Sequence, residues 1–238
     1  MDMLPVAVLA GGLATRLRPV TERIPKSLVE IAGEPFVRHQ LRLLRRQGVS
    51  RVVLCLGYLG EMVRDEIGDG AEFGLHVEYS FDGPILLGTA GALRRARELL
   101  GPAFFVLYGD SYLECDYRAV QEAFFRSGTP ALMTVYENRG RFDTSNVALA
   151  DGKIVGYDKK TPSPDMHWID YGLGILRAGV LDRIAGDGFA DLADIYRELA
   201  AEGLLAGFGV DRRFYEMGSF PGMAALSEYL GGMPGKAE

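Results

Sequence analysis

A glycine-rich, cationic stretch is the part of this sequence whose residue types are best suited to chemistry. Residues 10–19 read AGGLATRLRP, and residues 25–27 read PKS. Glycines lack a Cβ, so the backbone at Gly11 and Gly12 can approach a polyphosphate closely and present N–H groups to it. The Arg16 guanidinium can fork two phosphate oxygens, and the Lys26 ammonium adds a point charge. The stretch therefore predicts a cradle for a triphosphate tail.

Two familiar phosphate-binding motifs do not describe this loop. A Walker A loop needs Gly-Lys followed by Ser or Thr, and no Gly-Lys pair occurs in the loop. A dinucleotide fingerprint needs GxGxxG leading directly into a helix, whereas Pro19 and Pro25 make this loop long and irregular. A tight turn with a solvated arginine would suit a lone Gly-Gly pair, but the combined spacing of glycines, Thr15, Arg16 and Lys26 favours the phosphate cradle.

A carboxylate follows another apolar run. Residues 103–108 read AFFVLY and are followed by Gly109 and Asp110. In an open α/β sheet, ligands bind at the carboxyl ends of the strands, so an acid at that position points into the site. Asp also caps turns frequently, but this position favours a functional carboxylate.

The elements that would position these residues alternate regularly. We expect strands at 5–10, 51–56, 75–79, 103–108, 131–136 and 169–176, and helices at 35–47, 59–67, 89–100, 117–126 and 192–201. Asp151-Gly152 between 145–150 and 153–157 predicts a hairpin. This pattern favours a three-layer α/β/α sandwich whose Rossmann-like mixed sheet is mostly parallel with a small antiparallel addition. We expect one domain over 1–238, in which the pattern changes between a first half (1–139) and a second half (140–238).

Composition narrows the function classes. The 238-residue chain carries a net charge of −6, which argues against nucleic acid as a partner because phosphate-backbone binding leaves a basic footprint. The sequence has no signal-like N-terminus and no run of membrane-spanning length, so we expect no membrane association. Two cysteines without a CxxC motif indicate a cytoplasmic protein. The three histidines have no zinc-ligand spacing.

The loop signature Gly-Gly-x-Ala-Thr-Arg-Leu-x-Pro, followed by Pro-Lys, resembles that of the sugar-1-phosphate nucleotidyltransferases, and the resemblance covers nearly the whole chain. Ala14 stands where many members have a third glycine. The resemblance implies that Arg16 and Lys26 grip the β- and γ-phosphates of a nucleoside triphosphate. The other nucleotide contacts that we expect from this loop are Leu9, Ala10, Gly11, Gly12 and Thr15.

Residues 87–93, LGTAGAL, resemble the nucleoside-contacting segment of the same family. Small residues at a helix start let a ribose or base pack against the backbone, and Gly88 and Thr89 are the candidates. A Thr-capped helix is the alternative. Asp82, just upstream, offers a carboxylate that would pair with guanine N1–H and N2–H.

The resemblance also implies a magnesium site. Asp110 matches the magnesium aspartate of Gly-Asp-Ser/Asn, and Glu216 stands where most relatives have Asp before x-Gly-Ser/Thr. Carboxylate oxygens suit Mg²⁺. The alternative for Glu216 is a surface acid before a helix that Ser219 caps.

The sugar-phosphate contacts fall in the second half. Residues 155–160, VGYDKK, resemble the acid-Lys element that holds the sugar phosphate, which implies Lys159, with Lys160 as the alternative register. Asp170 matches the place where relatives hold the sugar ring, and Asn146 is a further sugar-contact candidate. A solvated charge pair after a strand is the alternative for Lys159.

The implied reaction joins a nucleoside monophosphate to a sugar-1-phosphate and releases pyrophosphate, with Arg16, Lys26 and Asp110 as catalytic residues and Mg²⁺ as cofactor. A heptose- or mannose-type guanylyltransferase using GTP is the best candidate, and uridylyl or thymidylyl transfer to another sugar phosphate is the alternative. Cytidylyl transfer to phosphocholine would need an aromatic cage, for which Trp168, Tyr157 and Tyr171 are the candidates. A regulatory nucleotide-binding domain is disfavoured by intact Arg16, Lys26 and Asp110. We expect a monomer or homodimer.

Overall fold

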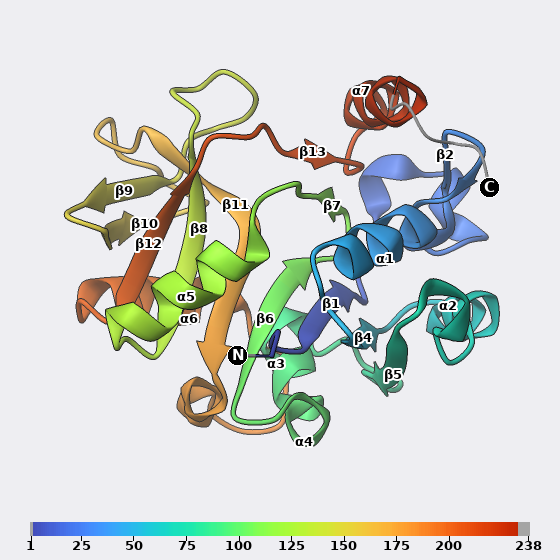
Figure 1. Ribbon diagram of the computed structural model, residues 1–238, viewed down its shortest axis with the longest axis horizontal. Helices are drawn as coiled ribbons and strands as arrows, with labels where there is room; N and C mark the ends of the chain where they lie inside the picture. Colours follow the sequence, from blue (N-terminus) through green and yellow to red (C-terminus); the bar gives the residue numbers. More distant parts are fainter. Residues whose placement is uncertain (1, 233–238) are drawn as a thin grey trace.

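A nine-stranded mixed sheet runs through the computed structural model, which describes residues 2–232 (Figure 1). The strand order is β5-β4-β1-β6-β11-β8-β12-β10-β9. The strands of this sheet are β1 (Val6–Ala10), β4 (Arg51–Leu56), β5 (His76–Phe81), β6 (Ala103–Tyr108), β8 (Ala131–Glu137), β9 (Val147–Ala150), β10 (Lys153–Tyr157), β11 (Trp168–Arg177) and β12 (Leu205–Val210).

The first half of the chain builds the parallel part of the sheet. β1 lies between β4 and β6 and is parallel to both, and β4 is also parallel to β5. The chain therefore turns in one direction after β1 and returns to the other side of it at β6. Such a reversal is a topological switch point, where ligands bind beyond the carboxyl ends of the strands.

The second half adds antiparallel pairings, among them the β9–β10 hairpin that Asp151-Gly152 predicted. β11 pairs antiparallel with both β6 and β8, and β10 pairs antiparallel with β9 and β12. The α/β/α layering and the mixed sheet predicted from sequence are thus confirmed. β12, which is parallel to β8, was not expected. Its sequence, LAGFGV, holds two glycines and gives neither an apolar run nor a clear alternation.

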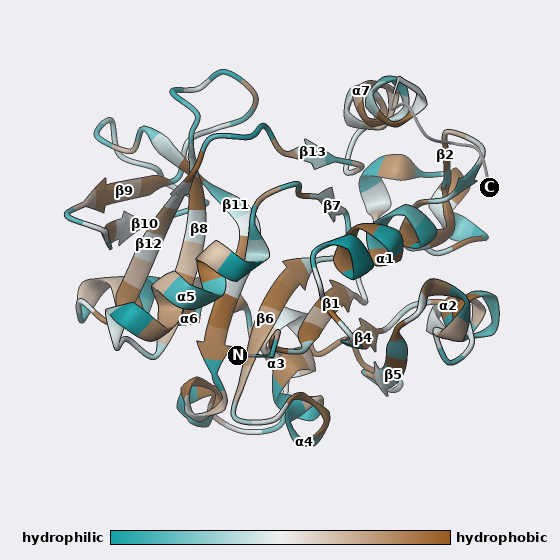
Figure 2. Ribbon diagram, viewed as in Figure 1, coloured by the Kyte–Doolittle hydropathy of each residue, from teal (hydrophilic) through white to brown (hydrophobic). Residues whose placement is uncertain are grey.

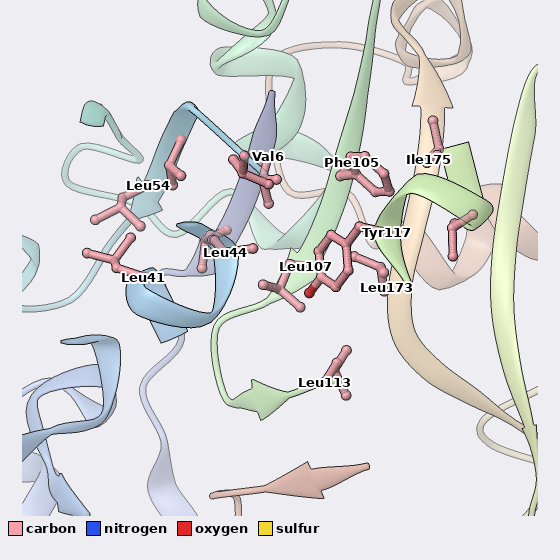
Figure 3. Close-up of a cluster of buried hydrophobic side chains, with 14 of the residues drawn as sticks. Val6, Leu41, Leu44, Leu54, Phe105, Leu107, Leu113, Tyr117, Leu173 and Ile175 are labelled. Atoms are coloured by element: carbon pink, nitrogen blue, oxygen red, sulfur yellow. The ribbon is translucent and has the colours of Figure 1, made fainter. Parts of the chain in front are cut away.

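Helices cover both faces of the sheet. One apolar core joins α1, α2 and α5 to one face, and a second joins α3, α4 and α6 to the other. Figure 3 shows part of the first, where Leu41 and Leu44 of α1 lie beside Val6 and Leu54 of the sheet. The helices are α1 (Phe36–Arg46), α2 (Gly60–Ile67), α3 (Gly88–Arg95), α4 (Arg97–Leu100), α5 (Tyr117–Ser127), α6 (Leu192–Ala201) and α7 (Phe220–Gly231).

Alternation along the central strands explains this two-sided burial. Val6 and Val8 belong to the first core, whereas Ala7 between them belongs to the second. Figure 2 shows the central strands as predominantly hydrophobic and the outer side of α1 as hydrophilic. The sequence predicted a single helix over 89–100. The structure divides it at Ala96 into α3 and α4.

A third, smaller core fastens the last helix to the parallel half. α7 packs with residues of α1 and of the small β2–β3 ribbon beside it (Figure 1). The minor strands are β2 (Glu30–Ile31), β3 (Glu34–Pro35), β7 (Ser111–Tyr112) and β13 (Tyr215–Glu216), and the 3₁₀ helices are η1 (Thr15–Leu17), η2 (Val20–Glu22), η3 (Lys26–Leu28), η4 (Ala71–Phe73) and η5 (Ala178–Arg183). β13 pairs antiparallel with β7, so the chain entering α7 passes directly beside the carboxyl end of β6.

Candidate functional site

A pocket of about 390 Å³ opens at the switch point, over the carboxyl ends of β1, β4 and β6. Residues from four strand ends and two loops contribute to its wall. The lining residues are Leu9, Ala10, Gly11, Gly12, Ala14, Arg16, Lys26, Ser27, Cys55, Asp82, Leu86, Gly88, Thr89, Ala92, Tyr108, Gly109, Asp110 and Phe189. All of the nucleotide contacts predicted from sequence line this pocket except Thr15, which is exposed in η1, where Ala14 lines the wall instead.

The backbone at the floor of the pocket is tightly packed. A Cβ at Gly109 would lie 2.6 Å from the carbonyl oxygen of Leu9 and 2.8 Å from the Cβ of Ala10. The Gly109 N–H donates to that Leu9 carbonyl at 2.9 Å. Glycine at this position therefore allows the end of β6 to close against the end of β1, which brings Asp110 next to the Gly11 loop.

Cations and the predicted catalytic acid meet at one end of the pocket. The Lys26 ammonium lies 2.7 Å from Asp110 Oδ2, in a partly buried ion pair between residues 84 positions apart. Arg16 and Lys26 also converge on Gly218, because a Cβ there would lie 3.5 Å from Arg16 Nη2 and 3.3 Å from Lys26 Nζ. This end of the pocket thus presents two positive charges beside the Asp110 carboxylate.

Glu216 reaches the same end from β13. It pairs with Ser111 of β7, and the Met217 N–H donates to the Asp110 carbonyl at 2.9 Å. Its carboxylate accepts hydrogen bonds from Gly218 N and from Ser219 Oγ. Ser219 caps α7 by accepting from Gly222 N at 3.1 Å. Glu216 therefore supports the start of α7 as well as lying beside the strand end that carries Asp110.

The carboxylates at this end suit Mg²⁺ better than a metal that is held entirely by protein ligands. Within residues 2–232, no group of three or more His, Cys, Asp or Glu side chains is placed to hold a metal ion. Mg²⁺ is commonly held by one or two carboxylates together with substrate phosphates. Asp110 directly precedes β7, and Glu216 lies on β13, which pairs with β7. Each carboxylate oxygen keeps a lone pair beyond its present bond, so both side chains fit a site of that kind.

The opposite end of the pocket is largely apolar and is formed by Cys55, Leu86, Ala92 and Phe189. Asp82, 7% exposed, is the acidic side chain of this end, and its Oδ2 accepts a hydrogen bond from Leu87 N at 3.0 Å. Burial raises the pKa of the Asp82 carboxyl, and the Leu87 bond opposes that rise.

Thr89 does not cap α3. The cap position of α3 is Leu87, whose own side chain makes no capping hydrogen bond. The Thr89 hydroxyl instead donates to Asp191 Oδ1 at 3.0 Å and accepts from Leu192 N at 2.7 Å. Thr89 therefore ties the loop before α6 to the pocket.

The predicted sugar-phosphate residues form a cluster on the antiparallel side of the pocket. Lys159 Nζ lies 3.2 Å from Asp170 Oδ2 and 3.3 Å from the hydroxyl of Tyr108, a residue that lines the pocket. Tyr157 donates to Asp170 at 3.2 Å. Asn146 accepts from the Asp170 N–H at 3.0 Å, which fixes the backbone that carries this acid. Lys159 thus extends the site outward from Tyr108, two residues before Asp110.

Charge interactions in this cluster keep Lys159 protonated. Burial opposes the charge on its ammonium, but the Asp170 carboxylate and Tyr108 outweigh burial and raise the pKa of Lys159. Burial, with Asp170 as the next cause, raises the pKa of the Tyr108 hydroxyl. Lys160 is exposed, and its backbone N–H donates to Asp158 Oδ1 at 2.7 Å, so it is Lys159 whose side chain joins Asp170.

The aromatic cage considered for phosphocholine is not formed. Tyr157 and Tyr171 are both buried, and they belong to cores on opposite faces of the sheet. Trp168 packs against Gly209 on β12, away from the switch-point pocket. Alternation along a strand separates such side chains, which proximity in sequence does not reveal.

Several pocket residues were not anticipated from sequence, among them Tyr108, Ser27 and Phe189. In the sequence Tyr108 is only the end of a predicted strand, and Ser27 is the residue after Lys26. Phe189 lies in the polar stretch 186–191, GDGFAD, which reads as a connecting loop. The phenylalanine within this polar stretch is the sequence feature that could have indicated a contact with the pocket.

Known proteins that are similar to this chain act on nucleotides, as the phosphate end of the pocket suggests. A family model described as nucleotidyl transferase matches residues 6–187. A UTP–glucose-1-phosphate uridylyltransferase of Synechocystis sp. is 28% identical over 232 residues, covering 90% of this chain and 60% of the relative. The catalytic subunit beta of a mannose-1-phosphate guanylyltransferase from Xenopus tropicalis is 32% identical over 207 residues, covering 83% of this chain and 56% of the relative. The chain thus spans between 56% and 60% of the length of these two curated relatives.

A solved structure of similar fold is a putative glucose-1-phosphate thymidylyltransferase from Bacillus anthracis in complex with a sucrose. It superposes with a TM-score of 0.84 at 20% identity, and the match covers 98% of each chain.

None of the helices formed by residues 2–232 has the length and apolarity that a membrane-spanning segment needs.

Proposed function

The chain belongs to the nucleotidyl transferase family, and on that premise we propose that it transfers a nucleoside monophosphate from a nucleoside triphosphate to a sugar-1-phosphate. One observation carries the proposal. Arg16, Lys26 and Asp110 converge at the switch point, while Lys159 contacts the hydroxyl of Tyr108, a residue that lines the same pocket. Cations both in the pocket and beside its wall suit two anionic substrates that must meet at one phosphorus.

The reaction that we propose needs little chemistry from side chains. A phosphate oxygen of the sugar-1-phosphate attacks the α-phosphorus, a new P–O bond forms there, and the bond from the α-phosphorus to pyrophosphate breaks. The attacking oxygen is already anionic near neutral pH, so no general base is needed. Catalysis is then mainly positioning and neutralisation of charge.

Each residue has a role that follows from its place. Arg16 and Lys26 hold the β- and γ-phosphates and stabilise the departing pyrophosphate. Lys159, which Asp170 and Tyr108 keep charged, holds the phosphate of the sugar. Asp170 and Asn146 position that lysine and face the sugar. Asp110 and Glu216 hold Mg²⁺, which when bound supplies neutralisation of the charge between the two phosphates.

For the nucleotide we propose GTP, with a mannose- or heptose-type sugar-1-phosphate. The buried Asp82 at the apolar end is an acceptor suited to guanine N1–H and N2–H. The 32% identity to a mannose-1-phosphate guanylyltransferase points the same way. UTP is the second candidate, because the Synechocystis relative is a uridylyltransferase.

A pyrophosphate-release assay tests the proposal. The purified chain is incubated with each of GTP, UTP, dTTP, CTP and ATP against a panel of sugar-1-phosphates and phosphocholine, with Mg²⁺ present. We expect release only when both substrates are present, and fastest with GTP and a mannose- or heptose-type sugar. Absence of release with every pair would overturn the proposed function, and fastest release with UTP would overturn only the choice of base.

A further inference from the structure

The switch-point pocket has two chemically different ends. Arg16, Lys26 and Asp110 make one end charged, whereas Cys55, Leu86, Ala92 and Phe189 make the other end apolar. A ligand that fits both ends carries a polyanionic tail and a head with apolar faces. A nucleobase has such faces together with a polar edge, and Asp82 lies at this end to meet that edge.

Phe189 is unusual among the residues of the apolar end because its side chain is 72% exposed. Its loop is nevertheless fastened to the start of α3. Ala190 N donates to the Leu87 carbonyl at 2.8 Å, and Ala90 N donates to the Ala190 carbonyl at 2.9 Å. The Thr89–Asp191 bond adds a third tie one residue further along the chain. A large aromatic ring is thus held on an anchored backbone with most of its surface uncovered.

The absence of a side chain at Gly88 leaves room for the ring of Phe189. A Cβ at Gly88 would lie 2.8 Å from Phe189 Cε2 and 2.5 Å from the Ala190 carbonyl oxygen. Gly88 also has a φ of +72°, a conformation that glycine adopts without strain. The ring therefore lies against the bare backbone of Gly88 and lines the pocket from that position.

We propose that Phe189 forms one wall of the nucleobase subsite and packs against the base of the bound nucleotide. The inference rests on the proposed function, since it requires a nucleotide in this pocket. The anchored ring supplies an apolar surface that stacks on a base at little cost in side-chain entropy. Phe189 then contributes to affinity for the base, while Arg16 and Lys26 contribute to affinity for the phosphates.

Calorimetry with three ligands separates these contributions. The ligands are the preferred nucleoside triphosphate, its nucleoside monophosphate and inorganic pyrophosphate. Replacing a stacking aromatic by alanine weakens base binding by roughly 5- to 150-fold. Phe189→Ala should lower affinity for the triphosphate and the monophosphate by about that factor and leave pyrophosphate affinity unchanged. Phe189→Tyr, which keeps the ring, should restore wild-type affinity.

Ile85→Ala is the matched control. Ile85 is also 72% exposed and lies in the loop before α3, but it does not line the pocket. This variant should bind all three ligands as the wild type does. Equal loss in Ile85→Ala and Phe189→Ala would overturn the inference, as would a Phe189→Ala variant that loses pyrophosphate affinity to the same extent.

The same experiment distinguishes the inference from the function on which it rests. A wild-type chain that binds no nucleoside triphosphate would defeat the proposed function. A wild-type chain that binds its triphosphate and a Phe189→Ala variant that binds it equally well would defeat the role of Phe189 alone.

Discussion

Lys26 and Asp110 form an ion pair, with Nζ 2.7 Å from Oδ2, although 84 residues separate them in the sequence. The pair exists because β1 and β6 are neighbours in the sheet, which brings the loop after β1 to the end of β6. It places the residue proposed to hold the nucleotide phosphates in contact with the residue proposed to hold the metal. Substitutions at either position should therefore affect the same step.

Removing either cation of the phosphate end should impair use of the nucleotide. Arg16→Ala and Lys26→Ala are each expected to lower kcat/KM for the nucleoside triphosphate by about 10²–10³, since each loses a charge-assisted contact made in the transition state. Arg23→Ala is the control, because Arg23 is exposed in the same segment and does not line the pocket. Steady-state kinetics check this. Near-wild-type values in both variants would contradict the triphosphate cradle.

Chelation should abolish activity. We expect EDTA to stop turnover and excess Mg²⁺ to restore it, because Asp110 and Glu216 are proposed to hold the ion. Asp110→Asn should cost more than Glu216→Gln, since an amide at 216 keeps one oxygen that accepts from Gly218 N and has an NH₂ that can donate to Ser219 Oγ, which preserves the support of α7. Rates across a Mg²⁺ titration of both variants measure this. Activity undiminished in EDTA would refute the metal site.

The two proposed lysines should separate by substrate. Lys159→Ala is expected to raise KM for the sugar-1-phosphate, or to lower kcat, and to leave nucleotide affinity nearly intact. Its charge is held by Asp170 and Tyr108 on the antiparallel side of the pocket. Calorimetry of nucleotide binding, together with kinetics in the sugar-1-phosphate, tests this.

Lys160→Ala is the matched control for Lys159, because Lys160 is the adjacent lysine and it is Lys159 whose side chain contacts Asp170 and Tyr108. It should behave as the wild type in both measurements. If Lys159→Ala lost nucleotide affinity as severely as Lys26→Ala, Lys159 would belong to the nucleotide site. If only Lys160→Ala raised KM or lowered kcat for the sugar-1-phosphate, Lys160 rather than Lys159 would hold the sugar phosphate.

Stability should decline in alkaline solution. Burial, with Asp170 next, raises the pKa of Tyr157 and of Tyr108, and Asp170 raises that of Lys159 against the opposing effect of burial. A group whose pKa is higher in the folded state stabilises the fold fully below its unfolded pKa, and this stability is lost as the pH rises toward the folded pKa. Since unfolded Tyr and Lys titrate near about 10 to 10.4, the free energy of unfolding should fall from about pH 10 upward.

Urea unfolding on both sides of about pH 10 checks this prediction. Tyr157→Phe should show a shallower decline than the wild type, because the buried hydroxyl is gone. Tyr58→Phe, at a residue that is 37% exposed, should decline as the wild type does. A Tyr157→Phe profile parallel to that of the wild type would contradict the assignment of this pH dependence to the Asp170 cluster.

Much of the fold could be predicted from sequence because its strands are short apolar runs separated by amphipathic helices. The run at 103–108 and the hairpin turn at Asp151-Gly152 each specify their structure locally. β12 could not be found in this way, since LAGFGV owes its place to pairing with β8 and β10 rather than to its own pattern. The order of strands, which brings Lys26 to Asp110, is likewise a property of the whole sheet.

The candidate site was predictable where residue type and strand end coincide. Asp110 and Gly11 follow directly from their positions after strands, and Asp82 follows from its place just upstream of residues 87–93; all three line the pocket. Thr15 lies in the signature loop but is exposed, because loop sequence does not determine side-chain direction. Phe189 is held at the pocket by backbone bonds between residues 87–90 and 190 and by the Thr89–Asp191 bond, contacts for which a single sequence gives no signal.

In the reaction that we propose, a sugar-1-phosphate displaces pyrophosphate from the α-phosphorus of a nucleoside triphosphate. ³¹P NMR of one reaction, with the preferred triphosphate, its sugar-1-phosphate and Mg²⁺, measures this directly. We predict that the signals of both substrates fall together and that inorganic pyrophosphate and a nucleoside diphosphate sugar appear in equal amounts. When the sugar-1-phosphate is omitted, the spectrum should stay constant over time. Formation of a nucleoside monophosphate or free nucleoside diphosphate, or pyrophosphate release without the sugar-1-phosphate, would contradict the account.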